Sequence, residues 1–215
     1  MDVDDAQKET PSGQDEQKTF LLTFVFGAAL IPIALLLGKA FSVDLATLIA
    51  FSFTHVFAGV AATFPLVALL YWFMRTRWAP LVAFRNSQLD FFSRIGFRLT
   101  LPRIIALSVL AGVSEEMLFR GVLQTAAMER LPVSLAIALP SLLFGALHAR
   151  TALYAAIAAG VGAYLGLLFW LTGGLVAPII AHALYDFVAF DWTRRIIDRP
   201  GASINQGARD QAAPQ

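Results

Sequence analysis

The residues best suited to chemistry in this sequence are two adjacent acids, Glu115 and Glu116, inside a long apolar run. Arg120 follows Glu116 by four residues. Residues four apart share one face of a helix, so Glu116 and Arg120 are expected to form an ion pair. Glu115 is rotated by about 100° from Glu116, because an α-helix has 3.6 residues per turn. The spacing therefore predicts that Arg120 neutralises one acid and leaves the other available for a different role.

Two further motifs place polar residues in apolar surroundings. Phe144 precedes His148 by four residues, and His182 precedes Asp186 by the same interval. A charge in the middle of a membrane costs about 2.5–3.5 kcal/mol on insertion scales, so such residues usually face a bundle interior and have a function. Together with Glu115, these residues offer a base, two imidazoles and a second acid. His55 has no acidic neighbour and no motif, and we interpret it as structural.

The composition indicates a membrane protein. The chain has 215 residues, of which 58% are hydrophobic and 14% charged, with a mean hydropathy of +0.68. Soluble domains average about 45–50% apolar and about 25% charged residues. A net charge of +1 provides no field that would attract nucleic acid, so no nucleic-acid partner is expected. With 0 cysteines, the sequence excludes disulfides and thiol catalysis.

Long apolar runs divide the chain into spans of roughly the length that crosses a bilayer, about 20 residues. The runs are residues 20–37, 45–73, 104 to about 128, 132–149, 151–171 and 175–190. Continuous runs favour helices over a barrel, whose strands would be about 9–11 residues long and alternate in polarity. We predict an all-α transmembrane bundle of about six spans over residues 20–192, with polar flexible tails at 1–19 and 193–215.

Basic residues predict the orientation of the bundle. The segment between the second and third runs contains a single acid, Asp90, and six arginines: Arg75, Arg77, Arg85, Arg94, Arg98 and Arg103. The positive-inside rule places this segment, and with six spans both termini, in the cytoplasm of a multi-pass cell-membrane protein. Its interleaved apolar residues suggest an amphipathic helix at the membrane surface, although an ordinary basic loop fits them as well. In the fifth run, the pattern Gly162-x-x-x-Gly166 predicts close helix packing.

The three motifs, taken in order, resemble the CPBP family of type II CAAX prenyl endopeptidases and bacteriocin-processing or immunity proteins, also called the Abi family. The resemblance covers about residues 100–192, and it implies an intramembrane glutamic endopeptidase with a polar cavity open to the cytosol. It implies that Glu115 activates water and that His148 helps to hold it. His182 and Asp186 would stabilise the oxyanion.

By the same resemblance, Glu116 and Arg120 would brace the site, and Phe144 would shape its wall. One position departs from the family pattern, because Asp186 stands where the family usually has Asn. Asn always donates a hydrogen bond, whereas Asp donates only when protonated. Asp186 could therefore donate to the oxyanion as an acid, or it could orient His182 by accepting its N–H.

The depth of the residues poses a problem for this site. Glu115 lies about 18 Å from the cytoplasmic end near Arg103, at 1.5 Å per residue. His148 is close to the inner end of its span, so straight helices would not bring the two together. Extension of the fourth helix past Arg150, a local dip in the membrane, or a bend at Pro140 would each resolve the difference.

Several functions remain open. We expect no cofactor, but Glu, His and Asp side chains can also bind zinc, which leaves a zinc-dependent membrane protease as an alternative. A non-catalytic immunity or binding protein and a proton-coupled transporter are further alternatives. The expected partners are membrane lipid and a peptide or protein substrate. A prenylated CAAX tail, a peptide precursor or a membrane-protein segment would each fit between helices.

Overall fold

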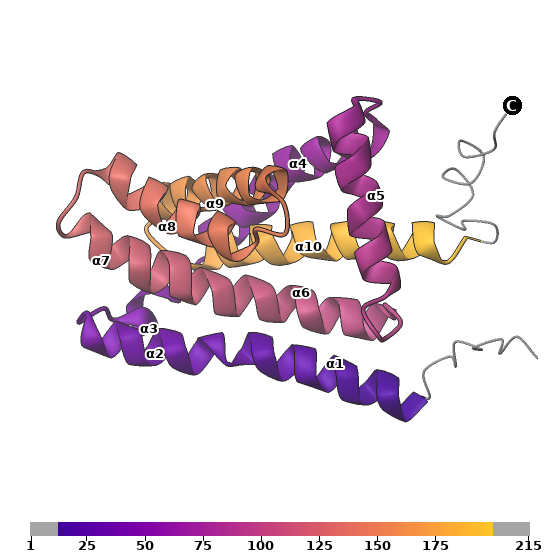
Figure 1. Cartoon of the computed structure of the whole chain (residues 1–215). Helices are drawn as coiled ribbons and strands as arrows, with labels where there is room; N and C mark the ends of the chain where they lie inside the picture. Colours follow the sequence, from indigo (N-terminus) through magenta and orange to yellow (C-terminus); the bar gives the residue numbers. More distant parts are fainter. Residues whose placement is uncertain (1–12, 200–215) are drawn as a thin grey trace, which may run out of the picture.

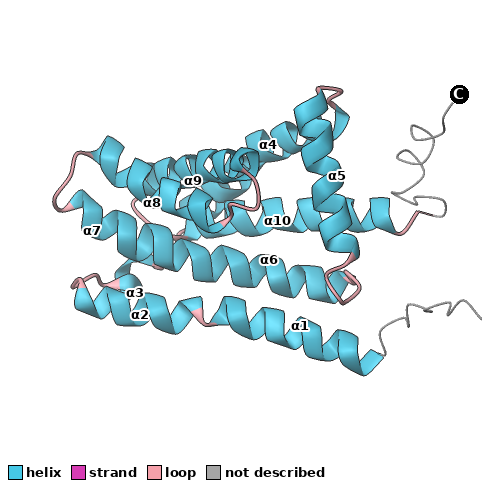
Figure 2. Cartoon of the chain, viewed as in Figure 1, coloured by secondary structure: helices cyan, strands magenta, loops and turns pink. Residues whose placement is uncertain are grey.

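The computed structural model describes residues 13–199, and every element in that range is helical (Figure 1 and Figure 2). This confirms the all-α prediction. The elements are α1 (Gly13–Ala28), α2 (Leu30–Ala40), α3 (Leu45–Leu48), α4 (Phe53–Arg75), α5 (Ala79–Ser93), α6 (Leu101–Glu116), the π-helix η1 (Met117–Gln124), α7 (Thr125–Met128), α8 (Val133–Leu147), α9 (Ala152–Thr172) and α10 (Val176–Ile197).

Among residues 13–199, three segments are long and apolar enough to cross a membrane: Gly13–Ala40, Phe53–Arg75 and Ala152–Thr172. α8 is a shorter apolar helix. Large apolar side chains also point outward from the bundle, among them Phe64 at 68% and Leu147 at 69% exposure. Such an exterior suits lipid and would be unusual in water, where exposed apolar patches stay small. The protein is a membrane-embedded helical bundle.

α10 is the central helix and packs between α4 and α6, with α9 also against it. α8 and α9 form a hairpin, and η1 packs against both. α1 and α2 run almost in line beside α6 (Figure 1). They are separate helices because Pro32 has no N–H to bond the carbonyl of Ala28, and the ladder breaks there.

The prediction of one continuous span over residues 45–73 is wrong at its start. The chain forms the single turn α3, leaves helical conformation over residues 49–52, and begins α4 only at Phe53. The carbonyl of Leu48 instead accepts a hydrogen bond of 2.7 Å from the backbone N–H of Leu175. The end of α3 therefore holds the start of α10, a tertiary contact that competes with continuation of the helix.

The helical part of the chain also extends further than predicted at both ends. α1 begins at Gly13, inside the segment expected as a tail, and Glu16 pairs with Arg103 at 3.1 Å. α10 continues to Ile197, because Asp191 accepts hydrogen bonds from Arg194 and stabilises the last turns. The remaining parts of the predicted tails, residues 1–12 and 200–215, lie outside the described residues.

The basic segment forms a helix, α5, as the amphipathic pattern suggested. Leu81, Phe84 and Leu89 are its buried residues. Arg85 donates 2.8 Å and 3.2 Å hydrogen bonds to the carbonyls of Met74 and Phe73, which end α4 without helical partners. α5 is thereby fixed across the end of the bundle (Figure 1).

The basic regions gather at one end of the molecule. Glu16 at the start of α1 pairs with Arg103 at the start of α6. At the same end, Arg150 between α8 and α9 donates a 3.0 Å hydrogen bond to Gln88 of α5, and α10 ends nearby (Figure 1). The α1, α5, α8–α9 and α10 segments that the orientation prediction assigned to one side of a membrane are thus at one end of the bundle.

Candidate active site

Glu115 and Glu116 are the last two residues of α6, at the point where the helix changes to the π-helix η1. A π-helix bonds each N–H to the carbonyl five residues back, and such segments are rare and often functional. The hydroxyl of Thr125 donates a 3.1 Å hydrogen bond to the carbonyl of Arg120, also five residues back. Arg120 lies within η1, four residues after Glu116.

The predicted ion pair between Glu116 and Arg120 is present. Their Oε1 and Nη1 atoms are 2.8 Å apart, and the side chains are 0% and 1% exposed. Nη2 of Arg120 donates a second hydrogen bond, of 2.6 Å, to the carbonyl of Gly162 on α9. The arginine therefore links η1 to α9 as well as neutralising the acid.

His182 on α10 binds the same carboxylate, which the sequence did not predict. Its Nδ1 is 2.8 Å from Oε1 of Glu116. Since Arg120 keeps Glu116 as a carboxylate, Nδ1 carries the proton and donates it to this hydrogen bond. This hydrogen bond requires α6 and α10 to lie close together. They do so at Gly112 of α6, where a Cβ would lie only 2.9 Å from the carbonyl oxygen of Ile179 of α10.

The other ring nitrogen of His182 faces two more accessible acids. Nε2 is 3.8 Å from Oε2 of Glu115 and 3.5 Å from Oδ2 of Asp186. Both carboxylate side chains are 20% exposed, against 7% for His182. One imidazole therefore separates a buried carboxylate from two accessible ones.

His148 directly follows α8, and the ring of Phe144 lies between it and His182. Its Nδ1 is 2.8 Å from the carbonyl of Phe144, so Nδ1 carries a proton and Nε2 is bare when the ring is neutral. The Phe144 ring lies 4.4 Å from that of His148 and 6.3 Å from that of His182. α8 ends at Leu147, so the fourth helix does not extend past Arg150. The contacts of the Phe144 ring nevertheless bring the end of α8 close to His182 on α10.

Two residues near the site were not singled out from the sequence. Gln124 is 1% exposed, and its Nε2 donates a 2.8 Å hydrogen bond to the carbonyl of Gly166. The ring of Tyr154 lies edge-on to His148 at 5.9 Å and also contacts Phe84 of α5. Gln124 could have been found from the sequence, because it is a polar residue in an apolar run one turn after Arg120. No comparable feature of the sequence marks Tyr154.

Within residues 13–199, no group of three or more His, Cys, Asp or Glu side chains is arranged to hold a metal ion. His55 lies at the start of α4, beside Gly174, and its buried Nδ1 has no hydrogen-bond partner in the described part of the chain. It takes no part in the cluster around His182.

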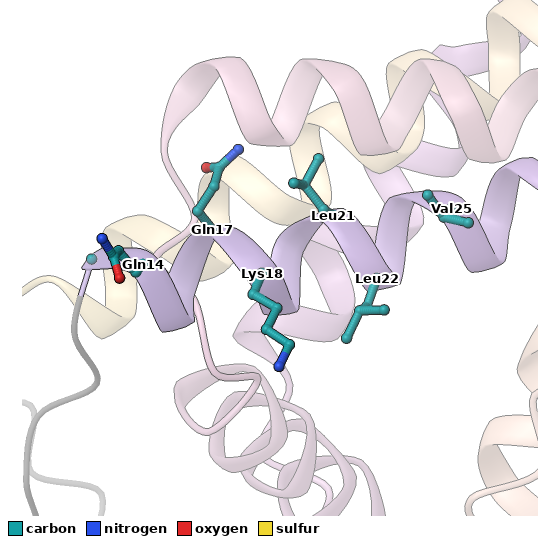
Figure 3. A pocket seen from close by; sticks show the side chains of 7 residues that line it. Gln14, Gln17, Lys18, Leu21, Leu22 and Val25 are labelled. Carbon is teal, nitrogen blue, oxygen red and sulfur yellow. The ribbon is translucent and has the colours of Figure 1, made fainter.

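A hollow of about 530 Å³ lies along α1, away from these residues (Figure 3). Its lining is Gly13, Gln14, Gln17, Lys18, Leu21, Leu22 and Val25, all from one helix. Figure 3 shows these side chains spread along an open helix surface. With a single wall and no acid or histidine, this hollow is unsuited to the chemistry considered above.

Comparison with known proteins agrees with the motifs. Residues 97–188 match the family described as "Type II CAAX prenyl endopeptidase Rce1-like", a family of membrane proteases, and this confirms the resemblance. The chain is also 33% identical over 115 residues to the "Uncharacterized protein YpbD" of Bacillus subtilis (strain 168). That match covers 52% of this chain and 56% of the relative, so the chain spans little more than half of its length. No solved structure matches the chain.

Proposed function

We propose that this protein is an intramembrane endopeptidase that hydrolyses peptide bonds with a water molecule activated by Glu115. The difference between its two adjacent acids carries the proposal. Glu116 is fully buried and bonded to Arg120 and His182. Glu115 is partly exposed, with its carboxylate 3.8 Å from an imidazole nitrogen. A general base needs such accessibility and the freedom to take a proton.

His148 completes the water site in this proposal. Its Nδ1–H is held by the carbonyl of Phe144, which leaves the Nε2 lone pair free to accept a hydrogen bond from water. Glu115 accepts the other proton of the same water. The two groups together orient the oxygen lone pair toward a substrate carbonyl, which is the positioning that lowers such barriers.

His182 is the donor to the oxyanion. Because Nδ1–H is committed to Glu116, a proton on Nε2 makes the ring an imidazolium, which Glu116 stabilises at 2.8 Å. A preorganised donor of this kind is worth about 10²–10³ in rate. Asp186, 3.5 Å from Nε2, is in reach of the same oxyanion in its protonated form.

The proposed steps conserve atoms and charge. Glu115 takes a proton from water as the oxygen attacks the peptide carbonyl carbon, and the negative charge passes to the carbonyl oxygen near His182. The tetrahedral intermediate then expels the amine, which receives the proton from Glu115. The immediate products are a carboxylic acid and a free amine, and Glu115 is again ionised. The proton of the acid then passes to the amine, which leaves a carboxylate and an ammonium group.

The substrate in this proposal is a peptide or protein that reaches the site from the membrane. A prenylated CAAX tail fits the family relationship, and a peptide precursor is the alternative. We propose a multi-pass location in the cell membrane with both termini in the cytoplasm, supported by the basic segments at one end of the bundle. Lipid is the second partner, and no nucleic acid is expected.

Glu115→Gln tests the proposal, with Glu129→Gln, at an exposed acid outside the site, as its control. Purified variants in lipid nanodiscs are incubated with peptides from cell membranes, and new termini are identified by mass spectrometry. We expect Glu115→Gln to fold normally and to yield no specific cleavage, whereas Glu129→Gln matches wild type. Full activity of Glu115→Gln would contradict the role of Glu115, and an unchanged cellular phenotype would favour a non-catalytic binding protein.

We propose that the reaction uses no metal, and a second assay separates this from a zinc mechanism. Cleavage is measured before and after dialysis against a chelator, with elemental analysis of the same sample. Undiminished cleavage by a metal-free sample supports the glutamic mechanism. Loss of activity that zinc restores would favour the zinc-dependent protease.

A further inference from the structure

We propose that Gln124 is a positioning residue, which fixes η1 against α9 so that Arg120, Glu116 and His182 keep their arrangement. The catalytic part of this inference rests on the proposed function. Gln124 is the last residue of η1, it is 1% exposed, and it donates a 2.8 Å hydrogen bond to the carbonyl of Gly166. A buried amide in an apolar bundle would be costly without such a partner.

Gln124 repeats, one turn later, the contact that Arg120 makes. Arg120 donates to the carbonyl of Gly162, and Gln124 donates to the carbonyl of Gly166. The two donors are four residues apart on η1, and the two acceptors are four residues apart on α9. Two parallel hydrogen bonds fix both the rotation and the translation of one helix on the other, which a single bond does not.

The glycines of α9 provide the room for these side chains. A Cβ at position 166 would lie 2.7 Å from Oε1 of Gln124, and one at position 162 would lie 3.3 Å from Nη2 of Arg120. The pattern Gly162-x-x-x-Gly166 predicted close helix packing. The structure shows in addition that side chains of η1 come close to these two glycines. The backbone carbonyls of the two glycines accept hydrogen bonds from two polar side chains of η1.

The effect on the site follows from the chain of contacts. Arg120 bonds Oε1 of Glu116, and the same oxygen accepts from His182. A displacement of η1 along α9 therefore moves Glu116 relative to α10. A misplacement of about 1 Å can reduce a rate roughly 100-fold, even when it originates away from the reacting atoms.

Gln124→Met tests this role, since it keeps the length of the side chain and removes the donor. We expect kcat to fall about ten- to a hundredfold with KM unchanged, because substrate binding does not involve Gln124. The control is Thr63→Val, which removes a buried hydroxyl that donates a 2.9 Å hydrogen bond to the carbonyl of Gly59 on α4. Equal kcat values in all three proteins would overturn the proposal, as would a rise in KM alone.

A second readout does not depend on activity. The chain has 3 histidines, so ¹⁵N-labelled histidine gives a simple NMR spectrum of the protein in detergent. We expect Gln124→Met to change the Nδ1 signal of His182 and to leave that of His55 unchanged. An unaltered His182 signal would refute the positioning role. If the wild-type protein cleaves no peptide, the proposed function fails, and this spectrum still decides the role of Gln124.

The contact itself is tested by a double-mutant cycle with Gly166→Ala. In wild type the added methyl meets the Gln124 amide, so we expect a lower unfolding midpoint. In the Gln124→Ala background that obstacle is gone, so the same substitution should lower the midpoint by less. Additive effects of the two substitutions would show that the residues do not interact and would contradict the proposed contact.

Discussion

Replacing Arg120 by leucine should destabilise the protein strongly, because it removes the cation bonded to the buried Glu116 and leaves that carboxylate with His182 as its hydrogen-bond donor. Both side chains are at most 1% exposed, and Oε2 of Glu116 has no hydrogen-bond partner among the described residues. Breaking one partner of a buried ion pair typically costs about 3–5 kcal/mol. Folded domains have a total stability of about 5–15 kcal/mol, so this change removes a large part of it.

The loss is measurable as a change in equilibrium unfolding. At about 1.4 kcal/mol per tenfold, it corresponds to roughly two to three and a half powers of ten in the unfolding constant. Unfolding in detergent can be followed by the fluorescence of the 4 tryptophans. The control is Arg150→Leu, which removes an exposed arginine bonded to Gln88. Such surface contacts are worth at most about 1 kcal/mol.

Removing the acid as well should restore part of the stability. In Glu116→Gln combined with Arg120→Leu, no buried charge is left unpaired, and the combined cost is expected to be smaller than the sum of the single costs. A variant Arg120→Leu that is as stable as wild type but inactive would refute this reasoning. It would then place the arginine in the chemical step.

Four more substitutions, at three positions, test the site. Asp186→Asn is expected to retain activity at every pH examined, since an amide donates to an oxyanion and Glu116 still orients His182. A hundredfold loss at all pH values would instead show that a carboxylate is required at position 186. Tyr154→Phe should be nearly neutral in a peptide-cleavage assay, whereas Tyr154→Ala should lower kcat by removing support for the His148 ring. Gly112→Val should reduce the unfolding free energy by about 1–3 kcal/mol and lower activity, because its side chain meets α10 and separates the helices.

The sequence predicted the parts of this structure that depend on local spacing. Glu116 ends α6 and Arg120 lies in η1, which follows without a break, so the i, i+4 spacing was enough to predict the pair. The apolar runs predicted the helices α8 and α9 to within a few residues, because the length of an apolar run is a property of that segment alone. The apolar residues interleaved with arginines suggested a helix in the region of α5, although a loop was an open alternative.

The parts that depend on packing between distant segments were not predicted. The bond from His182 to Glu116 needs α10 beside α6, and no residue of α10 reveals this contact on its own. The break before α4 depends on the tertiary bond from Leu175 to Leu48. The π-helical register of η1 also has no signature in the composition, and it determines where Gln124 lies.

The charges of the site suggest why two adjacent acids are useful in the proposed mechanism. The cluster contains the carboxyl groups of Glu115, Glu116 and Asp186, and Arg120 and a protonated His182 are its cations. When Glu115 takes a proton from water, its negative charge passes to the oxyanion, which lies beside the imidazolium. The charge thus moves toward a fixed donor in an environment of low dielectric, where such contacts are strongest. Glu116 cannot serve as this base, because it must remain ionised to hold His182 in place.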